Sequence, residues 1–154
     1  MTLTRIAAIV LVALGSWAGV TQDEKRNLSG SWLLVAPAEV AVQPPGQEET
    51  ITQTATTIVF GHPSEGGRHQ LTCGLDGQWR DSNIAGMRLS CRGSWENGKL
   101  VLVERNVSLP TASGAPSERT KIMHIDENGS LVTEIKPPIQ NLPGGPGKFV
   151  SRKR

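Results

Sequence analysis

Histidine, glutamate and cysteine side chains lie close together in one short stretch of the sequence. His62, Glu65 and His69 fall within eight residues, and Cys73 follows. Imidazole, carboxylate and thiolate groups are all ligands of transition metals. However, a proline and two glycines between the histidines indicate a loop over residues 61–67, in which no regular face aligns the ligands. We therefore predict neither a metal site nor another cofactor here.

Two other side chains are candidate ligand-binding residues. Glu104 is expected opposite Cys91 on an apolar strand face, where a buried carboxylate can fix a polar group of a ligand. A register shift of one residue would instead place Glu104 in water. Trp79 follows an Asp-Gly pair near the mouth of a predicted loop, where its ring can stack on a ligand or a partner. Core packing is the alternative role of Trp79.

The sequence does not contain a recognisable catalytic group. Nucleophilic catalysis needs a serine or cysteine held by a histidine and an orienting acid. The serines lie in turn-like segments, and no Gly-x-Ser-x-Gly elbow is present. Several carboxylates could in principle pair, but nothing in the sequence brings any two of them together. We therefore predict a protein that is not an enzyme and has no catalytic residues.

Composition indicates one β-rich domain. A chain of 154 residues suits a single domain, and its 17 glycines and 10 prolines disfavour a helical bundle. The net charge is +2 and the 16 basic residues are scattered, which excludes a typical nucleic-acid-binding protein.

Residues 1–20 have the three regions of a secretory signal peptide. A single basic residue, Arg5, precedes an apolar run over Ile6–Leu14, and small residues follow as far as Gly19. We expect cleavage between residues 18 and 21. The apolar stretch is shorter than the ~20 residues that span a bilayer as a helix, so we expect no stable membrane insertion after cleavage.

The mature chain, residues 21–154, is expected to be a single exported domain that is periplasmic or secreted and monomeric. Cys73 and Cys91 lie 18 positions apart. Outside the cytosol, two cysteines in a small domain favour a structural disulfide. A loop of this length would stabilise the fold by ~3 kcal/mol in the chain-entropy account.

The clearest strand signal covers Met87–Glu96, where apolar and polar residues alternate over ten positions. The cysteines follow the same alternation on two strands, so both are expected on apolar faces. Asn97-Gly98 favours a tight hairpin with Lys99–Arg105 as the partner strand. A two-residue turn would place Glu96 opposite Lys99.

A second Asn-Gly pair, Asn128-Gly129, indicates another hairpin. Residues 36–49 contain three prolines and predict a long loop. Eight or nine strands in one small domain favour a barrel or a sandwich. We predict an all-β fold in which an antiparallel up-and-down meander closes into a small eight-stranded barrel.

The segment from Asn27 to Trp32 resembles the Gly-x-Trp opening of lipocalins and other calycin barrels, with Gly30 and Trp32 as the matching residues. Trp95–Val101 also resembles a Trp-x-x-x-Lys-Leu-Val segment of small exported bacterial proteins with a lipocalin-like domain. The resemblance implies that Trp32 closes one end of the barrel and that a basic residue of the last strand, Arg152, packs across it, as a cation over an aromatic face does.

The same resemblance implies a non-catalytic barrel that binds an apolar or amphipathic small molecule in its interior. The alternative is a protein-interaction module. Exported bacterial inhibitors of metalloproteases are similar at Leu28–Trp32, and in them the residues before the first strand enter the protease cleft. Residues 21–26 are the corresponding segment here.

Overall fold

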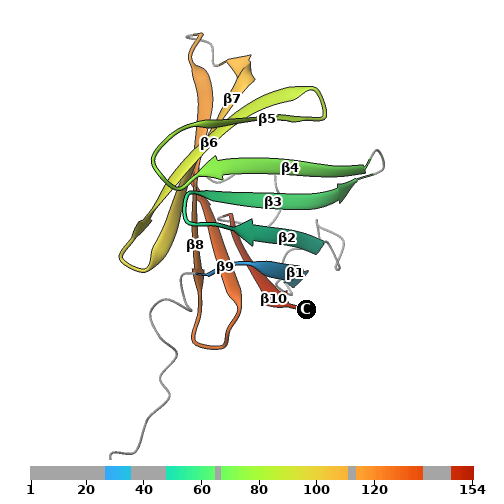
Figure 1. Cartoon of the computed structure of the whole chain (residues 1–154), viewed down its shortest axis with the longest axis vertical. Helices are drawn as coiled ribbons and strands as arrows, with labels where there is room; N and C mark the ends of the chain where they lie inside the picture. The colour runs from blue at the N-terminus through green and yellow to red at the C-terminus, as the bar shows by residue number, and fades with distance from the viewer. Residues whose placement is uncertain (1–26, 36–47, 65–66, 111–113, 137–146) are drawn as a thin grey trace, which may run out of the picture.

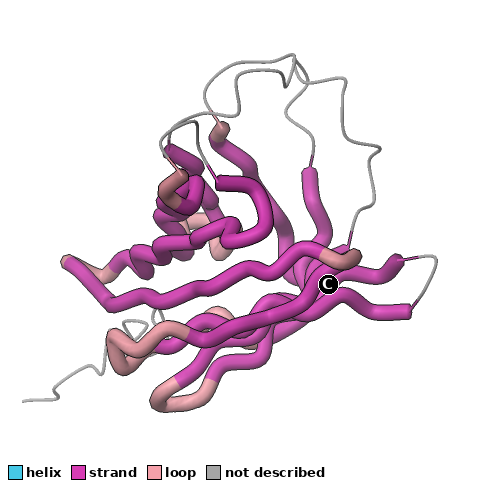
Figure 2. The backbone as a smooth tube through the Cα atoms, turned by 90° about the horizontal axis from the view of Figure 1, so that it is seen from above, coloured by secondary structure: helices cyan, strands magenta, loops and turns pink. Residues whose placement is uncertain are grey.

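The computed structural model describes residues 27–35, 48–64, 67–110, 114–136 and 147–154. All the regular secondary structure in these ranges is β-strand, as Figure 2 shows. The predicted signal peptide, segment 21–26 and most of the predicted loop 36–49 lie outside them. The strands are β1 (Gly30–Val35), β2 (Glu48–Gln53), β3 (Thr57–Ser64), β4 (Gly67–Gly74), β5 (Arg80–Ile84), β6 (Met87–Glu96), β7 (Lys99–Pro110), β8 (Pro116–Ile125), β9 (Leu131–Lys136) and β10 (Lys148–Lys153).

The strands form one sheet that curls into a barrel. Their order is β4-β3-β2-β1-β10-β9-β8-β7-β6-β5, and an additional parallel pairing of β4 with β6 closes a ring of nine strands. In Figure 1, β2, β3 and β4 cross the view while β7 and β8 run steeply to them. The prediction of an all-β barrel is confirmed, with nine strands in the ring and β5 as an extra strand in place of the predicted eight.

The extra strand β5 is joined to β6 by a turn that lacks the usual residues of a tight hairpin. Ala85 and Gly86 both have positive φ, at 50° and 81°, and join β5 to β6 in a tight hairpin. Positive φ is uncommon for alanine, which lacks the side-chain groups that make asparagine tolerant of it. For that reason a search for Asn-Gly or Asp-Gly pairs does not find this hairpin.

The Asn97-Gly98 hairpin has the predicted geometry. Both residues have positive φ, at 49° and 76°, as a two-residue hairpin turn requires. Glu96 pairs with Lys99, which confirms the predicted register. With this register Cys91 lies opposite Glu104, so Glu104 is on the interior face.

His62, which falls in the predicted loop, lies instead on a strand, opposite His69 on the next strand. β3 continues to Ser64 and β4 begins at Gly67, so His62 and His69 face each other in the antiparallel ladder. The prediction of a loop over residues 61–67 is therefore wrong. The backbone hydrogen bonds of the ladder continue through this segment despite its proline, which lies near the end of β3, where a missing donor costs least.

The barrel closes along a seam that has little backbone pairing. β4 and β6 pair at one position only, Gly74 with Arg92. The predicted disulfide between Cys73 and Cys91 is present beside this pair and joins the same two strands, with Cα atoms 4.5 Å apart. Farther along β4, the Thr72 amide donates to the Ser82 side chain of β5 at 3.0 Å. The seam thus depends on a covalent bond and side-chain contacts as well as on backbone hydrogen bonds.

Trp32 belongs to the apolar core, and its side chain is 2% exposed. The indole Nε1 donates to the Leu28 carbonyl oxygen at 2.8 Å, which satisfies the one polar atom of the ring. The other core residues are Leu28, Ile51, Ile58, Phe60, Leu71, Cys73, Cys91, Leu100, Leu102, Met123 and Leu131.

The cation over Trp32 is Lys153, with Nζ 5.8 Å from the ring centre, and the prediction of Arg152 in this role is wrong. The β1–β10 register pairs Trp32 with Lys153 and Leu33 with Arg152. Neighbouring residues of a strand point to opposite faces, so Arg152 lies on the outer face with Leu33. Gly30, at a φ of 144°, leaves space for Lys153, because a Cβ there would lie 2.9 Å from Lys153 Cε.

Lys153→Ala is expected to lower the free energy of unfolding by about 0.5–1 kcal/mol, since it removes the cation over Trp32 and the alkyl stem beside it. Arg152→Ala removes a cation from the outer face of the same strand and is the matched control, with an expected change near zero. Urea denaturation of both variants checks this. Equal losses for the two variants, or a larger loss for Arg152→Ala, would contradict the assignment.

Candidate functional site

Charged side chains occupy the barrel interior beyond the apolar core. Glu104 on β7 shares its strand face with Leu100 and Leu102 and is only 2% exposed. The β7–β8 register sets Glu104 opposite Arg119 and Leu102 opposite Lys121, so all of these side chains face inward. A carboxylate is rarely buried this deeply without a paired cation.

Glu104 is held by two cations. Arg119 Nε donates a short hydrogen bond to Oε2 of the carboxylate. Lys121 Nζ lies 2.7 Å from Oε1, in a geometry that makes an ion pair rather than a well-directed hydrogen bond. The Lys121 side chain is 15% exposed and that of Arg119 is 40% exposed, so Arg119 is the member of the cluster that meets solvent.

This cluster spans the barrel. Lys121 Nζ also lies 5.7 Å from the centre of the Phe60 ring, and Phe60 belongs to β3, which is not a neighbour of β8 in the sheet. A contact between non-adjacent strands of a closed barrel has to cross its interior. Phe60, Lys121 and Glu104 therefore form a layer across the barrel at the border of the apolar core.

The ionisation of Glu104 follows from its neighbours. Burial by itself would raise the pKa of this carboxyl, because the charged form loses its water. The charges of Lys121 and Arg119, which both lie in direct contact with the carboxylate, outweigh burial and lower the pKa below its ordinary value of 4.5. Glu104 is therefore ionised at neutral pH, and the three side chains together carry one net positive charge.

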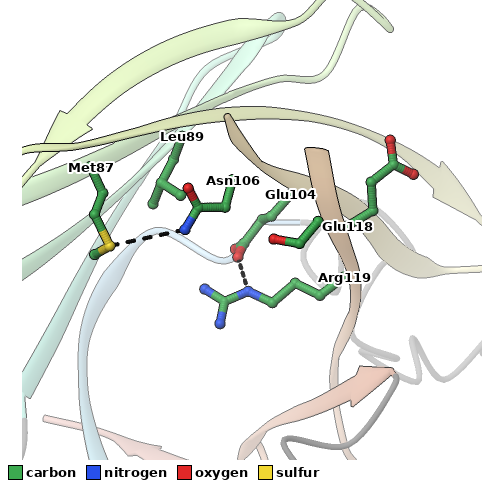
Figure 3. Close-up of a pocket in the computed structure, with 7 residues that line it drawn as sticks. Met87, Leu89, Glu104, Asn106, Glu118 and Arg119 are labelled. Carbon is green, nitrogen blue, oxygen red and sulfur yellow. Dashed lines mark hydrogen bonds and ion pairs between the residues drawn. The ribbon is translucent and has the colours of Figure 1, made fainter. Parts of the chain in front are cut away.

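A pocket of about 220 Å³ adjoins Glu104 and Arg119, as Figure 3 shows. Met87 and Leu89 of β6 give it an apolar side, and Asn106 of β7 lies next to Met87, with Nδ2 3.9 Å from the sulfur. Its lining residues are Met87, Leu89, Glu104, Asn106, Ser117, Glu118 and Arg119.

Trp79 lies away from this pocket. Arg92 and Arg105 both contact its ring, with guanidinium carbons 4.6 and 4.1 Å from the ring centre. Both arginines alternate with inward-facing residues and so lie on the outer face of the barrel. The structure thus brings one predicted ligand-binding residue, Glu104, into a pocket and places the other, Trp79, on the outer surface.

The histidines of the predicted metal-ligand set lie on the adjacent strands β3 and β4. His62 Nε2 lies 3.1 Å from Glu49 Oε1 of β2. Glu65 lies outside the described residues, and Cys73 is used in the disulfide. In the part of the chain that the structure describes, no three His, Cys, Asp or Glu side chains are arranged to hold a metal ion.

The sequence did not identify Arg119 and Lys121 as interior residues, because the alternation along their strand is compatible with either face pointing inward. In the segment from Pro116 to Ile125, both sets of alternate positions mix charged or polar residues with apolar ones, so the pattern does not show which set faces the interior. The one available signal is that Arg119 and Lys121 share their alternation with the apolar Met123, which is 2% exposed.

Comparison with known proteins gives no family for this chain. No protein-family model matches the sequence, and no curated protein sequence matches it either. Across the described ranges, no helix is long and apolar enough to cross a membrane.

Proposed function

We propose that this protein is an exported, non-catalytic β-barrel that binds a small amphipathic molecule in the pocket beside Glu104 and Arg119. The observation that carries the proposal is the pocket itself, which has an apolar side on β6 and a charged side on β7 and β8. Ligand sites typically combine apolar lining with a few placed polar groups. Pockets for drug-sized ligands typically have volumes of about 300–1,000 Å³, so a pocket of about 220 Å³ suits a smaller molecule or one end of a longer one.

The charged cluster gives this proposal independent support. Burying a carboxylate and an ammonium group costs more free energy than packing apolar side chains of the same volume in many proteins. The barrel nevertheless carries Glu104, Lys121 and Arg119 where its core could have continued. Such clusters are frequent at functional sites.

Export is part of the same proposal. The Cys73–Cys91 disulfide supports a compartment that is oxidising, as expected if residues 1–20 are removed during secretion. The resemblance to small exported lipocalin-like proteins agrees with an interior ligand. The alternative, an inhibitor that acts through residues 21–26, depends on a segment outside the described residues.

Native mass spectrometry of the mature protein, produced in an oxidising periplasm, tests the function. We expect extra mass of one small molecule in the native spectrum and none after denaturation. Ser117→Trp fills the pocket and is expected to remove this mass, whereas Ser94→Trp adds the same side chain on the outer face of β6 and is expected to keep it. If no mass is retained, titration with 1-anilinonaphthalene-8-sulfonate decides: absence of a saturable site that Ser117→Trp removes would contradict the proposal.

A further inference from the structure

We propose that the ligand carries one negative charge, as a carboxylate does, and that Arg119 binds this group in the pocket. This inference rests on the proposed function and adds the chemical class of the ligand. Its support is the charge of the cluster, the orientation of the Arg119 guanidinium and the apolar residues of β6 that line the pocket.

The charge of the cluster favours an anion. Glu104 contributes one negative charge, and Arg119 and Lys121 contribute two positive charges within direct contact of it. One positive charge therefore remains uncompensated within the cluster. Glu118 also borders the pocket, but its carboxylate is paired with Arg105 at 2.6 Å, so its charge is compensated by that residue. A monoanionic ligand would neutralise the cluster, and a cationic ligand would add to its excess charge.

Arg119 is the residue positioned to receive this anion. Only its Nε is directed at Glu104, and the two terminal nitrogens of the guanidinium point away from that carboxylate in Figure 3. A guanidinium can bind two carboxylates through different edges, because its five N–H donors form a rigid planar fork. Glu104 is a positioning residue in this arrangement, since it fixes the orientation of the fork from a fully buried site.

The apolar side of the pocket indicates what the carboxylate is attached to. Met87 and Leu89 line the pocket from β6, and Met87 is 38% exposed. A flexible thioether side chain adapts to apolar groups of different shape. A ligand with a carboxylate at Arg119 and a short alkyl or aryl group against Met87 would match both sides of the pocket.

Isothermal titration calorimetry with three eight-carbon compounds tests the inference. Octanoate, octanol and octyltrimethylammonium share an alkyl chain and differ in head-group charge. We expect octanoate to bind the wild-type protein with one-to-one stoichiometry and about tenfold to a hundredfold more tightly than octanol, the range for a hydrogen-bonded charged group. Octyltrimethylammonium is expected to bind more weakly than octanol.

Two arginine variants locate the effect. Arg119→Gln is expected to remove the preference for octanoate over octanol, whereas Arg92→Gln removes an arginine from the outer face of β6 and is expected to preserve it. Equal affinity of the wild-type protein for octanoate and octanol would overturn the inference and leave the proposed function standing, a result that does not depend on whether the variants fold. A preference that survives in folded Arg119→Gln would also overturn it. Absence of binding by all three compounds would overturn both proposals.

Discussion

Glu104→Gln is expected to lower the free energy of unfolding by about 3 kcal/mol, measured by urea denaturation at pH 7. The side chain is 2% exposed and its carboxylate contacts both Arg119 and Lys121. Removing one partner of a buried charge cluster leaves the other charges uncompensated, which typically costs about 3–5 kcal/mol. We place the value at the lower end because Arg119 is 40% exposed and can turn toward water.

Glu118→Gln is the matched control for this variant. Glu118 also pairs with an arginine, but both side chains are substantially exposed, so the expected loss is only about 0–1 kcal/mol. If both variants lose the same amount, the Glu104 cluster does not stabilise the fold as argued.

The pH dependence of unfolding gives the Glu104 variant a second readout. The pKa of Glu104 is lowered in the folded protein, because Lys121 and Arg119 outweigh its burial. Its contribution to stability is thus fully present above its ordinary pKa of 4.5 and is lost as the pH falls through the lower folded value. The wild-type protein should lose stability over this acidic range more steeply than Glu104→Gln, and parallel profiles would contradict the assignment.

Cys73→Ala/Cys91→Ala is expected to lower the free energy of unfolding by about 3 kcal/mol, the magnitude for a closed loop of this length. The disulfide joins β4 and β6 beside the single residue pair that closes the barrel. Its loss should therefore also loosen the seam. β6 carries Met87 and Leu89, so we expect the double variant to bind pocket ligands more weakly even where it remains folded.

Reduction of the wild-type protein distinguishes the contribution of the covalent bond to stability from the contribution of the packed sulfur atoms. Dithiothreitol-treated wild-type protein keeps both buried side chains and should lose nearly as much stability as the double variant. A reduced protein as stable as the oxidised one would show that the backbone and side-chain contacts suffice to close the seam.

Local patterns in the sequence predict much of the barrel wall. The alternation over Met87–Glu96 and the Asn97-Gly98 turn both describe contacts between residues that are close along the chain. Their physical causes are the pleat of a strand and the backbone freedom of a turn, which act within a few residues. The same alternation correctly assigned both cysteines to apolar faces, and the register of this one hairpin was enough to place Glu104 opposite Cys91.

The closure of the barrel and the composition of its pocket depend on strands that are distant in the sequence. Lys153 rather than Arg152 covers Trp32 because of the register between β1 and β10, and no turn joins those strands directly. Likewise, Arg119 and Lys121 face inward only because β8 pairs with β7 in one of two possible alternations. A shift of one residue exchanges the two faces of a strand without changing its local pattern. Residue types along one strand thus predict that a strand forms, whereas pairing with its neighbours selects the side chains that enter the pocket.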